Sequence, residues 1–132
     1  MSCNAFTGAP RYTFIIEQGS TTNFEVRYLD DSSNPIDLSG YQARMQLRPT
    51  VDSSTILLAL SSSLQPDGTG LNMSGSTGAL PLASGSIGVY ISAATSSALT
   101  FSEAVYDLEI SNATTVTRLL QGKIKLSREV TR

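Results

Sequence analysis

The chain has 132 residues, 15% of them charged, and a formal net charge of −2. This length suits one domain with one hydrophobic core, and a weakly acidic chain lacks the overall basic field of a nucleic-acid binder. With no histidine and one cysteine, a Ser-His-Asp or Cys-His constellation and a tetrahedral zinc site are excluded. We therefore expect no enzymatic activity and no cofactor.

The first part of the chain predicts an extended arm followed by strands. Residues 1–10 are small and polar, which predicts an N-terminal arm, and a β-sandwich domain is expected over residues 11–127. Residues 12–17 are rich in aromatic and β-branched side chains, so they are expected to form a strand. In Thr22–Leu29, alternate residues are apolar, which indicates a strand with one buried face.

The middle of the chain continues the β pattern. Residues 41–48 place Ala43, Met45 and Leu47 on one face. Residues 55–60 are almost continuously apolar, which predicts a strand buried on both sides or at a sheet centre. A Pro-Asp-Gly turn, residues 66–68, separates this run from a short strand near residue 72.

The last third of the chain predicts three or four more strands and a short helix. Residues 86–92 alternate, and residues 93–99 contain neither Gly nor Pro, so one or two helical turns are expected there. Strands are expected over residues 103–110, 115–120 and 123–127, with a break or bulge at Gly122 and a tail over residues 128–132. About seven to nine short strands with frequent turns favour an all-β antiparallel sandwich or barrel.

Carboxylates are the remaining candidates for chemistry. Asp107 and Glu109 lie two apart on a predicted strand and therefore share a face, as a hydrolytic pair would, but we expect both to be solvated. Residues 30–34 offer several oxygens without the spacing of a calcium loop. We expect Asp30, Asp31 and Asp37 to stabilise turns.

Basic residues gather near the end of the chain. Five of the nine fall in the last fifteen positions, which suggests a docking surface, with a solvated strand face and tail as the alternative. With Arg11 included, the candidate docking residues are Arg11, Arg118, Lys123, Lys125, Arg128 and Arg132.

Six phrases carry a family resemblance. They are residues 17–21 (EQGST), 34–48 (NPIDLSGYQARMQLR), 88–95 (GVYISAAT), 105–110 (VYDLEI), 118–127 (RLLQGKIKLS) and 129–132 (EVTR). In this order they resemble small structural proteins of tailed bacteriophages, including phages of cyanobacteria, and the N-terminal anchoring domain of phage baseplate upper proteins. The resemblance implies an immunoglobulin-like antiparallel β-sandwich that attaches to other proteins and has no catalytic activity.

The resemblance favours a virion structural protein, assembled in the cytoplasm of the bacterial host. Because no receptor-binding domain follows residue 132, we expect an adaptor between tail or baseplate and fibre. A capsid decoration (cement) protein is the alternative, and a glycan-binding or hydrolytic module is a third hypothesis. The expected partners are other virion proteins of tail, baseplate, fibre or capsid, with further copies of the chain as a homo-oligomer. Nucleic acid is not expected as a partner, because the chain lacks an overall basic field. A membrane is not expected either, because no segment approaches the ~20 apolar residues of a membrane span.

Overall fold

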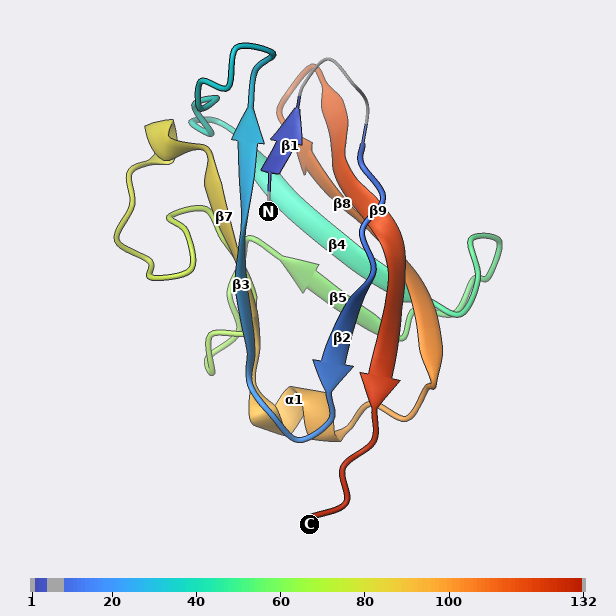
Figure 1. Ribbon diagram of the computed structural model, residues 1–132. Helices are drawn as coiled ribbons and strands as arrows, with labels where there is room; N and C mark the ends of the chain where they lie inside the picture. Colours follow the sequence, from blue (N-terminus) through green and yellow to red (C-terminus); the bar gives the residue numbers. More distant parts are fainter. Residues whose placement is uncertain (1, 5–8, 132) are drawn as a thin grey trace.

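The protein is a two-layer β-sandwich in the computed structural model, which describes residues 2–4 and 9–131 (Figure 1). One sheet has four strands, in the order β1 (Ser2–Asn4), β3 (Thr22–Leu29), β7 (Ser86–Ile91) and β6 (Gly70–Asn72). The other has five, in the order β2 (Phe14–Glu17), β9 (Val116–Ser127), β8 (Glu103–Ser111), β4 (Gln42–Arg48) and β5 (Leu58–Ser61). The expected all-β sandwich is confirmed. Two pairs, β1–β3 and β2–β9, are parallel, and the other pairs are antiparallel.

The core lies between the two sheets and follows the predicted alternation. Along β4, Ala43, Met45 and Leu47 are buried while the residues between them are exposed or half-buried. The four-stranded sheet contributes inward-facing residues of β3 and β7, which pair side by side, as Val26 and Ile87 do. Leu38, in the turn before β4, is also buried.

The prediction that residues 55–60 form a strand buried on both sides or at a sheet centre is wrong. β5 contains only Leu58–Ser61 and lies at the edge of the five-stranded sheet, paired with β4 alone. Ile56 is 46% exposed, and within β5 only Leu60 is fully buried. A continuous apolar run does not reveal its position in a sheet, because it fits a central strand and a partly exposed edge equally well.

The bulge predicted at Gly122 lies elsewhere. β9 is one strand of 12 residues, and its register with β8 shifts where Leu108 pairs with Leu120 but Glu109 pairs with Arg118. Leu119 is therefore the extra residue, and it is buried together with its neighbour Leu120. Two consecutive buried leucines fit a bulge, because strict alternation would expose one of them.

A short helix closes one end of the sandwich, as expected. α1 (Ala93–Ser97) begins after Ser92, whose hydroxyl accepts a hydrogen bond from the Thr95 amide at 3.1 Å. The loop after β2 holds both the helix and the C-terminal segment. Gln18 donates to the Leu99 carbonyl at 2.7 Å, and its side-chain oxygen accepts from the Glu129 amide at 3.0 Å.

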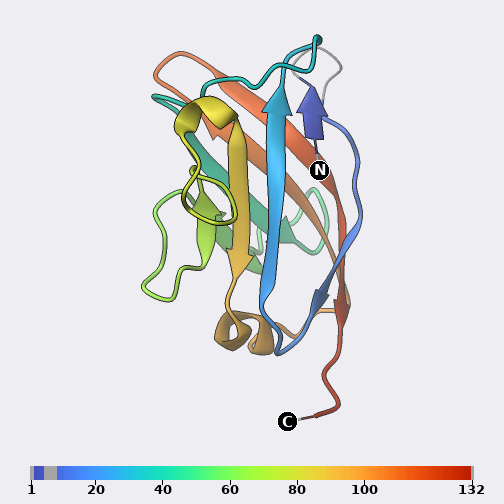
Figure 2. The same ribbon diagram turned by 60° about the vertical axis from the view of Figure 1, so that its left-hand side comes forward.

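The outer face of the four-stranded sheet is covered in part by the chain itself. The segment between β6 and β7 contains the 3-10 turn η1 (Leu82–Ser84) and loops back over this face (Figure 2). Its backbone at Gly75 lies against Gly88 of β7, where a side chain would meet the Gly75 carbonyl oxygen. The Ser76 amide donates to Glu25 on β3 at 3.1 Å. Nothing comparable covers the outer face of the five-stranded sheet within the described part of the chain.

Candidate functional site

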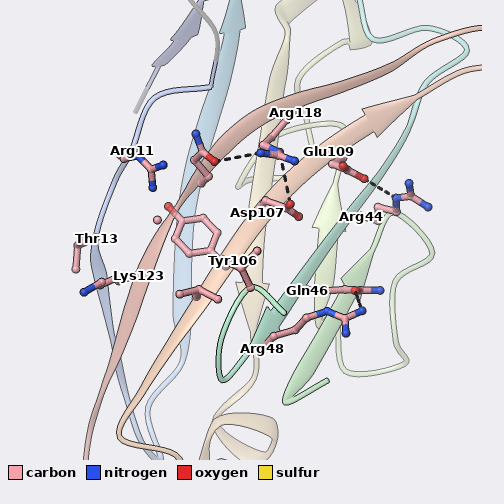
Figure 3. Close-up of a pocket in the computed structure, with 14 residues that line it drawn as sticks. Arg11, Thr13, Arg44, Gln46, Arg48, Tyr106, Asp107, Glu109, Arg118 and Lys123 are labelled. Carbon is pink, nitrogen blue, oxygen red and sulfur yellow. Dashed lines mark hydrogen bonds and ion pairs between the residues drawn. The ribbon is translucent and has the colours of Figure 1, made fainter. Parts of the chain in front are cut away.

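A groove of ≈ 760 Å³ lies on the outer face of the five-stranded sheet (Figure 3). It extends from the segment that precedes β2, across β9 and β8, to β4 and the loop after it. The lining residues are Arg11, Thr13, Arg44, Gln46, Arg48, Val51, Val105, Tyr106, Asp107, Glu109, Arg118, Gln121, Gly122 and Lys123. Five cations face two carboxylates among them, which leaves an excess of three positive charges on a chain whose net charge is −2.

Strand register arranges these side chains in rows across the sheet. In one row Glu109 of β8 lies between Arg44 of β4 and Arg118 of β9. In a parallel row, four residues away along β8, Val105 lies between Arg48 and Lys123. The outward positions of β8 thus carry carboxylates on both sides of Val105, with Glu103 on one side and Asp107 and Glu109 on the other, while both neighbouring strands carry cations.

The carboxylates of the groove are already paired. Arg44 binds Glu109 at 2.9 Å (Nε to Oε1), and Arg118 approaches Asp107 at 3.5 Å (Nε to Oδ2). Burial raises the pKa of Asp107, and the charge of Glu109 raises it further, although the nearby arginines oppose both effects. Arginines and carboxylates therefore alternate across the three strands, and each of these two arginines has a carboxylate beside it.

The remaining cations of the groove are Arg11, Arg48 and Lys123, and they are less neutralised. Among the described residues, no carboxylate forms an ion pair with Arg11 or Arg48. Arg48 instead donates to the Ser53 carbonyl at 2.7 Å and to Gln46 at 2.8 Å, which fixes its guanidinium. Lys123 lies 3.6 Å from Glu103, but both side chains are about half exposed, so this pair is weak.

Gly122 allows the segment before β2 to form one wall of the groove. A Cβ atom at this position would collide with the Tyr12 carbonyl oxygen, and its φ of 152° disfavours other residues. Tyr106, which pairs with Gly122 across β8 and β9, donates its hydroxyl to that carbonyl at 2.7 Å. The segment is also hydrogen-bonded to Gln121, through the Tyr12 amide at 2.8 Å and the Pro10 carbonyl at 3.1 Å.

The structure brings three of the six predicted docking residues together. Arg11, Arg118 and Lys123 line the groove, and Lys125 faces the same side of β9 outside its lining. Arg128 follows β9 and approaches the Thr100 carbonyl at 3.5 Å, away from the groove. Arg132 lies outside the described residues.

Sequence reasoning missed two of the groove's cations, Arg44 and Arg48. Both occupy outward positions of a strand whose alternation was evident, and that was the available signal. What the sequence could not show is that β4 lies beside β8, which places these arginines opposite the basic residues of β9.

The other polar clusters have structural roles. As predicted, Asp30 and Asp37 accept backbone hydrogen bonds in turns; Asp37, for example, accepts from the Ser39 amide at 2.9 Å. A smaller hollow of ≈ 330 Å³ contains Asp67, which accepts a hydrogen bond from Ser92 at 2.6 Å. That bond, followed by bonds from Thr69, lowers the pKa of Asp67. This network joins the turn before β6 to the start of α1.

Neither a metal-binding cluster nor a membrane-spanning helix occurs in the described ranges. No group of three or more metal-ligating side chains lies together there. No helix there has the length and apolar character needed to cross a membrane.

The groove can bind anionic groups through arginine and lysine, and its surface contains apolar contacts at Val51 and Val105. A scan against protein-family models and a search of curated proteins both found no match to this chain.

Proposed function

We propose that the protein is a structural component of a tailed-phage virion, an adaptor that joins tail or baseplate to fibre by protein–protein docking. In this proposal the groove face of the five-stranded sheet is the docking surface. The protein performs no chemistry, and its task is to present a rigid, patterned surface to another virion protein.

The observation that carries the proposal is the asymmetry between the two outer faces. The chain covers part of the four-stranded sheet with its own loop, down to a backbone contact between Gly75 and Gly88. It leaves the five-stranded sheet open and lines it with five cations. An open sheet face with patterned charge is typical of a surface that another protein covers.

The sequence phrases support the same proposal, and the structure gives several of them a physical role. In the phrase at residues 17–21, Gln18 joins the loop to the end of α1 and to the C-terminal segment. Residues 118–127 form the cationic part of β9. The competing hydrolytic hypothesis rests on Asp107 and Glu109, and both are engaged with arginines.

Quantitative mass spectrometry of purified virions tests this proposal. The virions are those of the phage whose genome encodes the chain, with known capsid and tail proteins as internal standards. We expect the protein in the particle at a copy number on the scale of the tail's rotational symmetry. A copy number on the scale of the capsid lattice would instead support the decoration alternative, and absence from the particle would refute both.

A further inference from the structure

We infer that the groove binds an extended, acidic segment of the partner protein, with carboxylates held by Arg48, Lys123 and Arg11 and an apolar side chain placed on Val105. This inference rests on the proposed function, since it specifies the partner's chemistry at the same surface. It follows from which charges in the groove are already satisfied, from their spacing, and from what the floor would repel.

The first argument concerns charge that the chain leaves unbalanced. Glu109 lies 2.9 Å from Arg44 and Asp107 lies 3.5 Å from Arg118, so a carboxylate of β8 offsets part of the charge of each arginine, although the Arg118 pair is about as exposed as that of Lys123. Arg11 and Arg48 pair with no carboxylate among the described residues, and Lys123 has only a weak, half-exposed pair. The charges without a carboxylate partner among the described residues are therefore those of Arg11 and Arg48, at opposite sides of the groove, and Lys123 of β9 lies between them in strand order.

The second argument concerns preorganisation and spacing. The guanidinium of Arg48 is already fixed by the Ser53 carbonyl and Gln46, so binding would restrict it little further. Arg48 and Lys123 lie on strands that flank β8, so their backbones are two strand spacings apart, about 10 Å. Carboxylates two and four residues apart on an extended segment share one face and are about 7 and 13 Å apart, which brackets this distance within the reach of the long Arg48 and Lys123 side chains.

The third argument favours a peptide over nucleic acid. Asp107 lies in the row next to that of Arg48 and Lys123, and Glu109 lies in the row beyond, so both would repel a phosphate chain, which is charged at every nucleotide, wherever it left the Arg48–Lys123 row. An extended peptide instead places its side chains at intervals, so it can direct carboxylates to the cations and apolar groups to Val105 and Val51. Val51 is 81% exposed, and such an apolar side chain would bury part of that surface.

Fluorescence anisotropy with a defined probe tests the inference. The probe is a labelled synthetic peptide with the repeat Asp-Ser-Val-Ser, which places aspartate and valine in turn on one face of an extended chain, and the control peptide carries asparagine in place of aspartate. The wild-type chain is expected to bind the aspartate peptide at least about tenfold more tightly than the control peptide, with an affinity that falls as salt rises. Equal binding of the two peptides, or no binding of either, would overturn the inference.

Two groove variants and one matched control locate the binding. The double variant Arg48→Glu/Lys123→Glu is expected to weaken binding of the aspartate peptide about tenfold or more. Arg11→Glu/Lys123→Glu is a second test that leaves the Arg48 contacts intact. The control Arg27→Glu/Arg128→Glu makes the same charge change at two exposed positions outside the groove and should leave binding unchanged. An equal loss in all three variants would show that only net charge matters and would overturn the inference.

Two further measurements separate other occupants and the underlying proposal. Tighter binding of a single-stranded DNA oligonucleotide than of the peptide would overturn the inference, as would wild-type self-association that the groove variants abolish in sedimentation. If the protein is in virions but the groove variants are incorporated as well as wild type, the inference fails while the proposed function stands. If the peptide binds as expected but the protein is absent from virions, the proposed function fails instead.

Discussion

Adding a single methyl group at Gly122 should push the segment before β2, which forms one wall of the groove, away from the sheet. In Gly122→Ala the new Cβ atom would collide with the Tyr12 carbonyl oxygen, which is backbone and therefore cannot move alone. The segment before β2 must shift away from β9, and Arg11 and Thr13 shift with it. The substitution should thus affect both stability and the groove.

The contacts at Gly122 set the expected magnitude. An alanine held at a φ of 152° costs about 1–3 kcal/mol. Displacing the segment also breaks the two backbone hydrogen bonds to Gln121 and the bond from the Tyr106 hydroxyl, each of about 1 kcal/mol. We therefore expect the free energy of unfolding to fall by about 4–6 kcal/mol.

Urea denaturation compares Gly122→Ala with Gly40→Ala, a control that isolates backbone strain. Gly40 has a φ of 80°, and no atom lies within 4 Å of the position of an added Cβ. Gly40→Ala should therefore lose only about 1–2 kcal/mol. Limited proteolysis should cleave the segment before β2 faster in Gly122→Ala alone. Equal destabilisation of the two variants, with no change in proteolysis, would refute the close approach of this segment to β9.

Three further outcomes are expected from single substitutions. Gln18→Ala should lower the free energy of unfolding by about 2 kcal/mol in urea titrations, because two hydrogen bonds are lost; an unchanged midpoint would contradict the role of Gln18. Asp107 has a pKa raised mainly by burial, so its ionisation opposes folding, and the stability of Asp107→Asn relative to wild type should rise as pH increases above the ordinary carboxyl pKa. Asp67 has a lowered pKa, so Asp67→Asn should be less stable than wild type at neutral pH. This deficit should disappear as pH falls below the pKa that Asp67 has in the folded protein. Unfolding curves over a pH series check both signs, and the same trend in the two variants would contradict the assignment.

Local periodicity was sufficient to predict most of the strands, but not β1, which lies in the predicted N-terminal arm. The alternation in β3 and in β4 identified which residues are buried, because a strand with one face in the core has a strict period of two. The short helix was also predictable, since residues 93–99 lack helix breakers and follow a serine that can cap the first turn.

Pairing between distant strands was not predictable, and the groove depends on it. Arg48 and Lys123 lie 75 positions apart in the sequence, and they flank Val105 only because β4 and β9 both pair with β8. The edge position of β5 and the bulge at Leu119 depend in the same way on partner strands. Clustering of basic residues along the sequence identified the β9 half of the groove and also drew in Arg128, which lies away from it.

The central claim is that the open face of the five-stranded sheet docks to another virion protein. A cryo-electron microscopy map of the assembled phage particle at residue resolution tests it most directly. We expect the groove between Arg48 and Lys123 to be covered by an extended acidic segment of a tail, baseplate or fibre protein, with the loop before β7 facing away from that contact. A map in which this chain is bound through the covered face, with the groove open to solvent, would contradict the claim.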